Sequence, residues 1–242
     1  VSATSADAIA GDSLAITATG TFTGNGAKNV GTNKAVDVSA GALTGADASN
    51  YTLLNSTGST TASVTPRTLT ASYLGGSRVY DGTATAPVTR TLSGLLQGDT
   101  VTASETAEFA GGSAGKNVGT GKAVLVTGIA LSGADAINYS LVSDSASATG
   151  TITPRPLTVS GLSGITAVDR TYDGTLAVSL NVPGSLGSAS GDALAGDQVS
   201  VVIAGGGIGS GTLLDKNAGQ SKPVVLSGLS LTGADAGNYF IG

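Results

Sequence analysis

Gly-Ala-Asp-Ala-Ile-Asn-Tyr, residues 133–139, decides how this chain is organised, because the same passage occurs three times. It is present with one substitution at residues 45–51 and again at residues 233–239. The asparagines of successive copies are 138 − 50 = 88 and 238 − 138 = 100 residues apart. A passage that returns at such a period indicates a tandem array of similar units. The 242 residues are therefore expected to form about three small domains.

Other blocks keep the same phase and locate the unit boundaries. Lys-Asn-Val-Gly-Thr at residues 28–32 returns at 116–120, and as Lys-Asn-Ala-Gly-Gln at 216–220. Gly-Asp occurs in all three copies, whereas Tyr-Asp-Gly-Thr and Thr-Pro-Arg occur in only two. The positions of these blocks predict repeats at residues 1–66, 67–154 and 155–242. Only the middle repeat contains every block and is complete.

The first repeat lacks the opening Tyr-Asp-Gly block and the third lacks the closing Thr-Pro segment. We expect the chain to be a window cut from a longer array, since the two absent pieces are contiguous in such an array. The alternative is an incomplete subunit that accepts a strand from a neighbour.

The sequence pattern predicts β-strands throughout. Thr, Val and Ser alternate with small apolar residues in short runs bounded by Gly, Asp and Asn, as in the equivalent segments 35–38, 123–126 and 223–226. A closing strand is expected at residues 146–153, followed by Pro154. Proline stiffens a linker and ends a strand ladder, so the short proline junctions favour a rod of repeats. Helix is expected only as a single turn at residues 46–50 and its equivalents.

Composition excludes several classes of function. The formal charge of −5 argues against nucleic acid as a partner, and no run approaches the ~20 apolar residues of a membrane helix. The chain has no His and no Cys, so it lacks the usual general base, thiol nucleophile and zinc ligands. Fourteen of its sixteen acidic residues are aspartates, mostly single and in turns, which does not suit a calcium cluster. We therefore predict no enzyme activity, no cofactor and no metal site.

The repeated Asp-Ala-x-Asn-Tyr is interpreted as a structural corner. It lies between an apolar run, residues 129–131, and a further expected strand, residues 139–141. In immunoglobulin-type sandwiches a tyrosine at such a corner hydrogen-bonds to upstream backbone and fixes the turn. The residues assigned to this role are Asp47, Tyr51, Asp135, Tyr139, Asp235 and Tyr239.

Six lysines also recur in phase, and two hypotheses account for them. They can pair with nearby aspartates at the surface, where each pair contributes well under ~1 kcal/mol. Alternatively they form a ladder that binds an anionic or hydroxyl-rich polysaccharide through many weak contacts, which linkage multiplies. The six are Lys28, Lys34, Lys116, Lys122, Lys216 and Lys222.

Taken together, these blocks resemble the YDG/MBG repeats of very large secreted bacterial adhesins. The order is Tyr-Asp-Gly-Thr, Gly-Asp, Lys-Asn-Val-Gly-Thr-Gly-Lys, Leu-Ser-Gly-Ala-Asp-Ala-x-Asn-Tyr and Thr-Ile-Thr-Pro, and the middle repeat matches it best. Such proteins are similar to filamentous haemagglutinin and to biofilm-matrix adhesins such as CdrA, which are exported by two-partner secretion. The third copy departs from the pattern at Ala218, Gln220 and Ser221.

The resemblance implies an extracellular, cell-surface array of small all-β units of immunoglobulin-like sandwich type, with a β-grasp-like unit as the second choice. It implies a structural stalk that projects a binding tip and supports cell–cell or biofilm-matrix adhesion. The alternative function is weak, multivalent binding of exopolysaccharide or host glycan by the repeats themselves. Neighbouring repeats of the same array are the expected protein partners.

Overall fold

The computed structural model describes residues 8–159, 162, 164–183, 186, 192–203 and 208–242. Strands dominate this part of the chain, so the prediction of an all-β protein is confirmed. Helix is limited there to four short 3₁₀ turns, η1 (Ala48–Asn50), η2 (Gly112–Lys116), η3 (Ala136–Asn138) and η4 (Ala236–Asn238). Three of these are the expected corner turns, and η2 was not foreseen. No helix in the described ranges is long and apolar enough to cross a membrane.

Packing divides the chain into two units that do not coincide with the sequence repeats. The first unit comprises residues 1–71, 92–104 and 129–144, and the second comprises 72–91, 105–128 and 145–242. The middle repeat therefore contributes to both. Each unit contains one of the two junctions between successive repeats, which lie near residues 65–66 and 154.

In the first unit, the first repeat forms one antiparallel sheet of order β1-β2-β3. Its strands are β1 (Ala15–Phe22), β2 (Gly31–Thr44) and β3 (Thr57–Val64). Val36 is the only buried residue between residues 8 and 66. This sheet therefore has little apolar core of its own.

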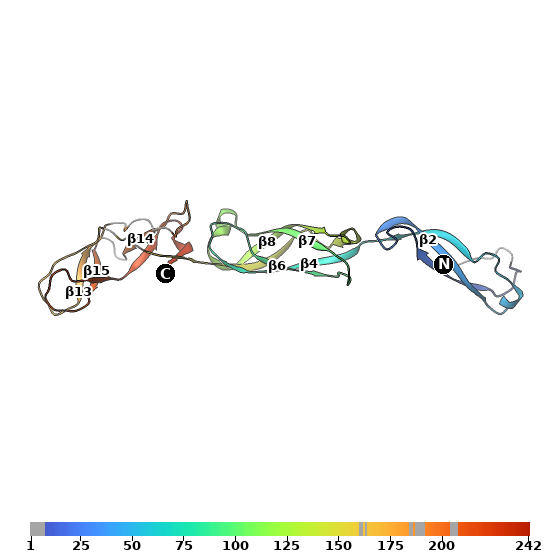
Figure 1. Ribbon diagram of the computed structural model, residues 1–242, viewed down its shortest axis with the longest axis horizontal. Coiled ribbons are helices and arrows are strands. Elements are labelled where there is room, and N and C mark those ends of the chain that lie inside the picture. Colours follow the sequence, from blue (N-terminus) through green and yellow to red (C-terminus); the bar gives the residue numbers. More distant parts are fainter. Residues whose placement is uncertain (1–7, 160–161, 163, 184–185, 187–191, 204–207) are drawn as a thin grey trace. The chain divides into compact units, whose positions relative to one another are not determined.

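The chain passes from the first repeat to the second through Thr65 and Pro66 alone. Strand β4 (Arg67–Gly75) then pairs in parallel with β9 (Tyr139–Leu141), so that Leu69 lies opposite Leu141. Leu69 is fully buried and packs with Val101 and Tyr139, and partly buried Leu131 joins this cluster. Strand β6 (Val88–Ser93) completes the sheet, whose order is β6-β4-β9. Figure 1 labels β4 and β6 of this sheet.

The rest of the middle repeat forms a second sheet of order β5-β10-β8-β7. The predicted closing strand is present as β10 (Ala146–Thr153), and Ile152 within it is 1% exposed. Val124 of the neighbouring β8 and Phe109 of β7, the strand beyond it, are also fully buried. The other strands are β5 (Ser77–Val79), β7 (Thr102–Phe109) and β8 (Gly119–Ser132).

In the second unit, Pro154 alone separates β10 from the first strand of the third repeat. This strand, β11 (Arg155–Leu157), pairs in parallel with β18 (Tyr239–Ile241), as β4 pairs with β9. A four-stranded sheet has the order β12-β13-β15-β16, and β14 pairs with β17. These strands are β12 (Thr166–Ala167), β13 (Ala177–Asn181), β14 (Ser200–Ile203), β15 (Ile208–Leu213), β16 (Val224–Leu226) and β17 (Leu229–Thr232).

Gly150 in β10 should be sensitive to substitution by alanine. A Cβ at this position would lie 2.6 Å from the carbonyl oxygen of Gly76 and 3.1 Å from the ring of Phe109. Overpacking of this kind costs about 1–3 kcal/mol, so Gly150→Ala should lower the free energy of unfolding by that amount in denaturant titrations. Gly58→Ala is the control, because a Cβ at Gly58 in β3 meets nothing within 4 Å. Equal effects of the two substitutions would contradict the close packing of β10.

Candidate functional site: the junctions between repeats

Each repeat contains the same corner, built around its tyrosine. The Tyr139 hydroxyl donates a hydrogen bond to Asp99 Oδ2 at 2.6 Å and accepts one from the Leu96 N–H at 3.2 Å. Tyr51 makes the same pair of bonds with Asp12 and the Ile9 N–H, at 2.7 and 3.0 Å. Tyr239 makes them with Asp197 and the Leu194 N–H, at 2.6 and 3.0 Å. Each tyrosine thus holds the Gly-Asp loop of its own repeat against the corner.

The aspartate of the corner binds the same loop from the other side. Asp135 Oδ2 accepts a hydrogen bond from the Thr100 N–H at 3.0 Å. The backbone approaches so closely here that a Cβ on Gly133, whose φ is +117°, would lie 2.4 Å from the Thr100 carbonyl oxygen. The equivalent bonds join Ser13 N–H to Asp47 and Gln198 N–H to Asp235, at 2.9 and 3.0 Å. All six residues assigned to the corner by sequence therefore meet the Gly-Asp loop.

The asparagine of the same motif contacts the preceding repeat, a role that the sequence pattern did not predict. At the first junction, Asn138 Oδ1 accepts the Val30 N–H at 2.9 Å, and Asn138 Nδ2 donates to Asn29 Oδ1 at 3.2 Å. At the second junction, Asn238 makes the same two contacts with Val118 and Asn117, at 2.9 and 3.3 Å. The Lys-Asn-Val block of one repeat is thus bound by the Asp-Ala-x-Asn-Tyr block of the next.

The first lysine of each block crosses the junction as well. Lys28 Nζ lies 3.2 Å from Asp135 Oδ1 and 3.9 Å from Asp99 Oδ1. Lys116 Nζ lies 3.5 Å from Asp197 Oδ1 and 3.6 Å from Asp235 Oδ1. Each lysine therefore sits between the two aspartates that form the corner of the following repeat.

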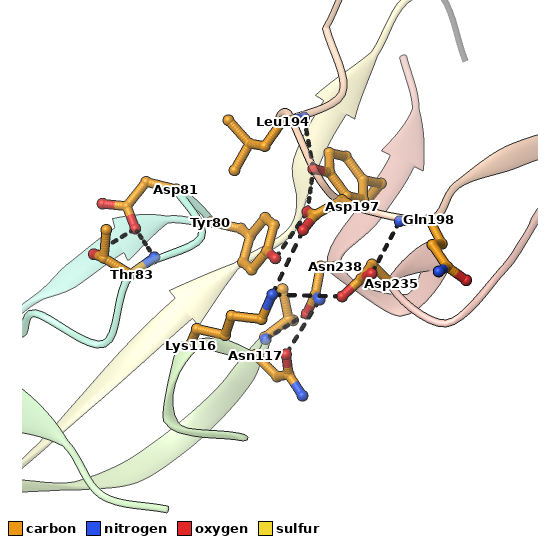
Figure 2. A network of polar contacts seen from close by, with 12 residues as sticks. Tyr80, Asp81, Thr83, Lys116, Asn117, Leu194, Asp197, Gln198, Asp235 and Asn238 are labelled. Atoms are coloured by element: carbon orange, nitrogen blue, oxygen red, sulfur yellow. Dashed lines mark hydrogen bonds and ion pairs between the residues drawn. The ribbon is translucent and has the colours of Figure 1, made fainter. Parts of the chain in front are cut away.

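At the second junction, the Tyr-Asp-Gly motif adds a further contact (Figure 2). The Tyr80 hydroxyl points at Asp197 and donates a hydrogen bond to its Oδ2 at 2.8 Å. The Tyr80 ring meets the Tyr239 ring edge to face, with centroids 5.4 Å apart, an arrangement favoured by aromatic quadrupoles. Asp197 thereby contacts Tyr239 of its own repeat and both Tyr80 and Lys116 of the preceding repeat.

Tyr80 also changes the exposure of the junction. Its side chain is completely buried. The Lys116 side chain is 32% exposed and that of Asp197 7%, whereas the corresponding Lys28 and Asp99 are 73% and 19% exposed. Charges shielded from water interact more strongly than exposed ones at the same separation, so the Lys116–Asp197 pair is less weakened by solvent than the Lys28–Asp99 pair.

The second lysine of each repeat serves its own turn. Lys34 Nζ donates to the Gly26 carbonyl oxygen at 2.8 Å, and Lys122 Nζ to that of Ala114 at 3.5 Å. Lys222 binds the Asp215 carboxylate and the backbone carbonyl oxygen of Asn217. Lys216 lines a cavity that Lys222 also lines. Two of the six phased lysines thus contact the following repeat, three bind their own turns, and Lys216 only lines this cavity.

The aspartate of the Tyr-Asp-Gly motif closes its own turn. Asp81 Oδ1 accepts the Thr83 N–H at 2.9 Å, and Asp173 accepts that of Thr175 at 2.8 Å. Arg78 also pairs with Asp81, and its Nε donates to the Thr85 carbonyl oxygen. In the described residues, no three acidic side chains gather in a way that could hold a metal ion.

Protonation of the corner residues is coupled to these contacts. The Thr100 N–H, followed by Lys28, lowers the pKa of Asp135 below its ordinary 3.8. Burial by itself would raise the pKa of Asp197, but the hydrogen bonds from Tyr239 and Tyr80 and the charge of Lys116 leave it lowered. Burial, together with the bond to Asp197, raises the pKa of Tyr239 from 10.0 to about 12. These contacts therefore favour the ionised forms of Asp135 and Asp197 and the neutral form of Tyr239.

Comparison with protein families identifies these repeats. The YDG domain matches residues 1–62, 65–148 and 153–242, and the chain belongs to this family. No curated protein and no solved structure matches the chain. Tyr80 of the Tyr-Asp-Gly block binds the repeat that follows it in this chain.

Tyr80→Phe should weaken the second junction. It removes a hydrogen bond to a charged group, which contributes about 1.5–3 kcal/mol, while the ring contact with Tyr239 is retained. We expect the unfolding free energy to fall by about that amount, and the Leu194 amide to exchange its hydrogen faster.

Tyr172→Phe is the matched control. Tyr172 occupies the same motif in the third repeat, but its side chain is 60% exposed. This substitution should leave both measurements unchanged. If the two variants behave alike, Tyr80 does not hold the junction.

Stability should be greatest between about pH 5 and pH 9. The lowered pKa values of Asp135 and Asp197 give stability that is present above their ordinary 3.8 and lost as the pH falls through the native values. The raised pKa of Tyr239 gives stability that is present below pH 10.0 and lost as the pH rises toward about 12. Thermal unfolding measured from below pH 3.8 to above pH 10.0 tests both limbs. Tyr239→Phe should flatten the alkaline limb and also reduce the part of the acid limb that comes from Asp197, whose pKa the Tyr239 hydrogen bond lowers. An unchanged alkaline limb would contradict the assignment.

Proposed function

We propose that this chain is a structural stalk segment of an extracellular bacterial adhesin. In this proposal the YDG repeats are small β-sandwiches stacked into an extended rod, which holds a binding site elsewhere in the protein away from the cell. The arrangement would serve cell–cell or biofilm-matrix adhesion. Export by two-partner secretion, as in filamentous haemagglutinin-like proteins, is part of the same proposal.

The observation that carries the proposal is the recurrence of one junction. At both junctions a Lys-Asn-Val block meets Asp-Ala-x-Asn-Tyr, with matching donors, acceptors and distances. Linkers of one or two residues precede the next strand. In repeat arrays, stability is the sum of each repeat and its interfaces with neighbours. A contact that recurs at both junctions suits a protein in which repeats are joined end to end to increase its length.

The contacts of the phased lysines support a structural role for them rather than the alternative, in which they form a ladder that binds polysaccharide. Lys28 and Lys116 contact aspartates of the following repeat, and Lys34, Lys122 and Lys222 bind their own turns. A ladder for an anionic ligand would require these ammonium groups to face the ligand together. The phased lysines are better explained by the geometry of the array.

The length of the particle provides the test. Chains with one and two additional in-frame copies of residues 67–154 should show a maximum dimension, measured by small-angle X-ray scattering, that rises by an equal increment per copy. Paired Asn138→Ala and Asn238→Ala substitutions in the parent chain remove the asparagine hydrogen bonds of both junctions and should broaden its distance distribution. A flexible string of beads would instead lengthen roughly as the square root of the number of copies. Such scaling, or a compact globule, would refute the stalk.

A further inference from the structure

Pro154 lies between two parallel strand pairs, and both pairs belong to the second unit. On its N-terminal side, residues 151–153 of β10 pair with residues 77–79 of β5. On its C-terminal side, residues 155–157 of β11 pair with residues 239–241 of β18. The residue before a proline favours extended backbone, and the proline ring fixes its own φ. Tension in the chain at Pro154 therefore acts on the ends of β10 and β11 along their lengths.

Strand β10 is held along both of its edges, because it also pairs with β8 in antiparallel register. On the β5 side, the Thr151 N–H donates to the Gly76 carbonyl oxygen at 3.2 Å. The Thr153 carbonyl oxygen accepts the Tyr80 N–H at 2.9 Å. Ile152 lies between these two bonds and is 1% exposed, so water has little access to them. A pull along β10 loads the hydrogen bonds of both edges together.

Strand β11 is anchored by a leucine, as is its counterpart β4 in the first unit. Leu157 is fully buried, and its carbonyl oxygen accepts the Gly242 N–H at 3.1 Å. Leu69 of β4 is also fully buried, and its carbonyl oxygen accepts the Val142 N–H at 3.0 Å. The complete middle repeat and the third repeat therefore hold their first strands by the same parallel pair.

A second route joins β10 to β11 without passing through the proline. Tyr80, whose N–H binds Thr153, donates a hydrogen bond from its hydroxyl group to Asp197. Tyr239 donates to the same carboxylate and lies opposite Arg155 in the β11–β18 pair. Figure 2 shows the part of this route around Tyr80 and Asp197. A pull on the linker is therefore shared between the covalent chain and contacts made by both repeats.

We propose that the junction between YDG repeats is a force-bearing clamp, in which the parallel strand pairs on either side of the proline carry tension in shear. In shear, the hydrogen bonds of a strand pair bear the load at once, whereas bonds pulled across a sheet break one after another. This role goes beyond that of a spacer, because a spacer sets a distance without resisting force. It rests on the proposed function for the source of the tension, which is a binding site pulled away from the cell.

Single-molecule unfolding at constant force tests the clamp, and the chain suits the method because it contains no cysteine. Cysteines added at the two ends of the chain apply the load along it, through Pro154. Thr106→Cys on β7 and Ser147→Cys on β10, both exposed and on either side of β8, apply it across the sheet. At equal force, the middle repeat should unfold at least about tenfold more slowly under end loading, because several hydrogen bonds must break together. Equal rates in the two geometries would overturn the proposal.

Ile152→Ala in the clamp and Ile129→Ala outside it form a matched pair of variants. Both isoleucines are buried, but Ile129 lies beyond the residues of β8 that pair with β10. Under end loading, Ile152→Ala should raise the unfolding rate by about tenfold or more, and Ile129→Ala by about twofold or less. If both variants respond alike to load, β10 does not carry it. A long particle in scattering that unfolds equally fast in both loading geometries would reject the clamp and leave the stalk standing.

Discussion

The structure depends on one kind of interaction, a tyrosine hydroxyl bound to the aspartate of a Gly-Asp loop. Asp99 and Asp197 receive this bond from Tyr139 and Tyr239 of their own repeats. The same carboxylates face the lysine of the preceding repeat. A single charged group therefore closes a repeat internally and presents its docking face to a neighbour. A repeat whose corner is not folded cannot form this face, so folding and docking are coupled.

This coupling matters because the apolar cores are small. Between residues 8 and 66 only Val36 is buried, and the cluster around Leu69 is made of few side chains. Each buried methylene contributes about 0.8 kcal/mol, so interfaces form a large share of what holds such repeats. A carboxylate with 7% exposure is unfavourable unless it is paired. Asp197 thus favours the one register in which Lys116, Tyr80 and Tyr239 all reach it.

Much of the fold was predictable from sequence, because its determinants are local. Alternation of small apolar residues placed the strands equivalent to residues 123–126, and proline placed the end of β10. The corner was predictable because Asp135 and Tyr139 lie close in sequence to the turn they fix. The partners of the corner were harder to assign, since Asp99 is 40 residues from Tyr139. The only sequence signal for Asp99 as the partner was that Gly-Asp recurs at the same position in all three copies.

The contacts between repeats could not be deduced, because phase alone does not tell whether a residue acts within its own unit or on the next. Lys28 pairs with an aspartate 107 residues away, although each repeat has its own copy of that aspartate. Tyr80 shows the same ambiguity: as a buried tyrosine it could have served its own core, yet its hydroxyl binds Asp197 of the following repeat. Its counterpart Tyr172 is exposed, although the local sequence around both is Tyr-Asp-Gly-Thr. The local motif therefore does not decide by itself whether its tyrosine contacts a neighbouring repeat.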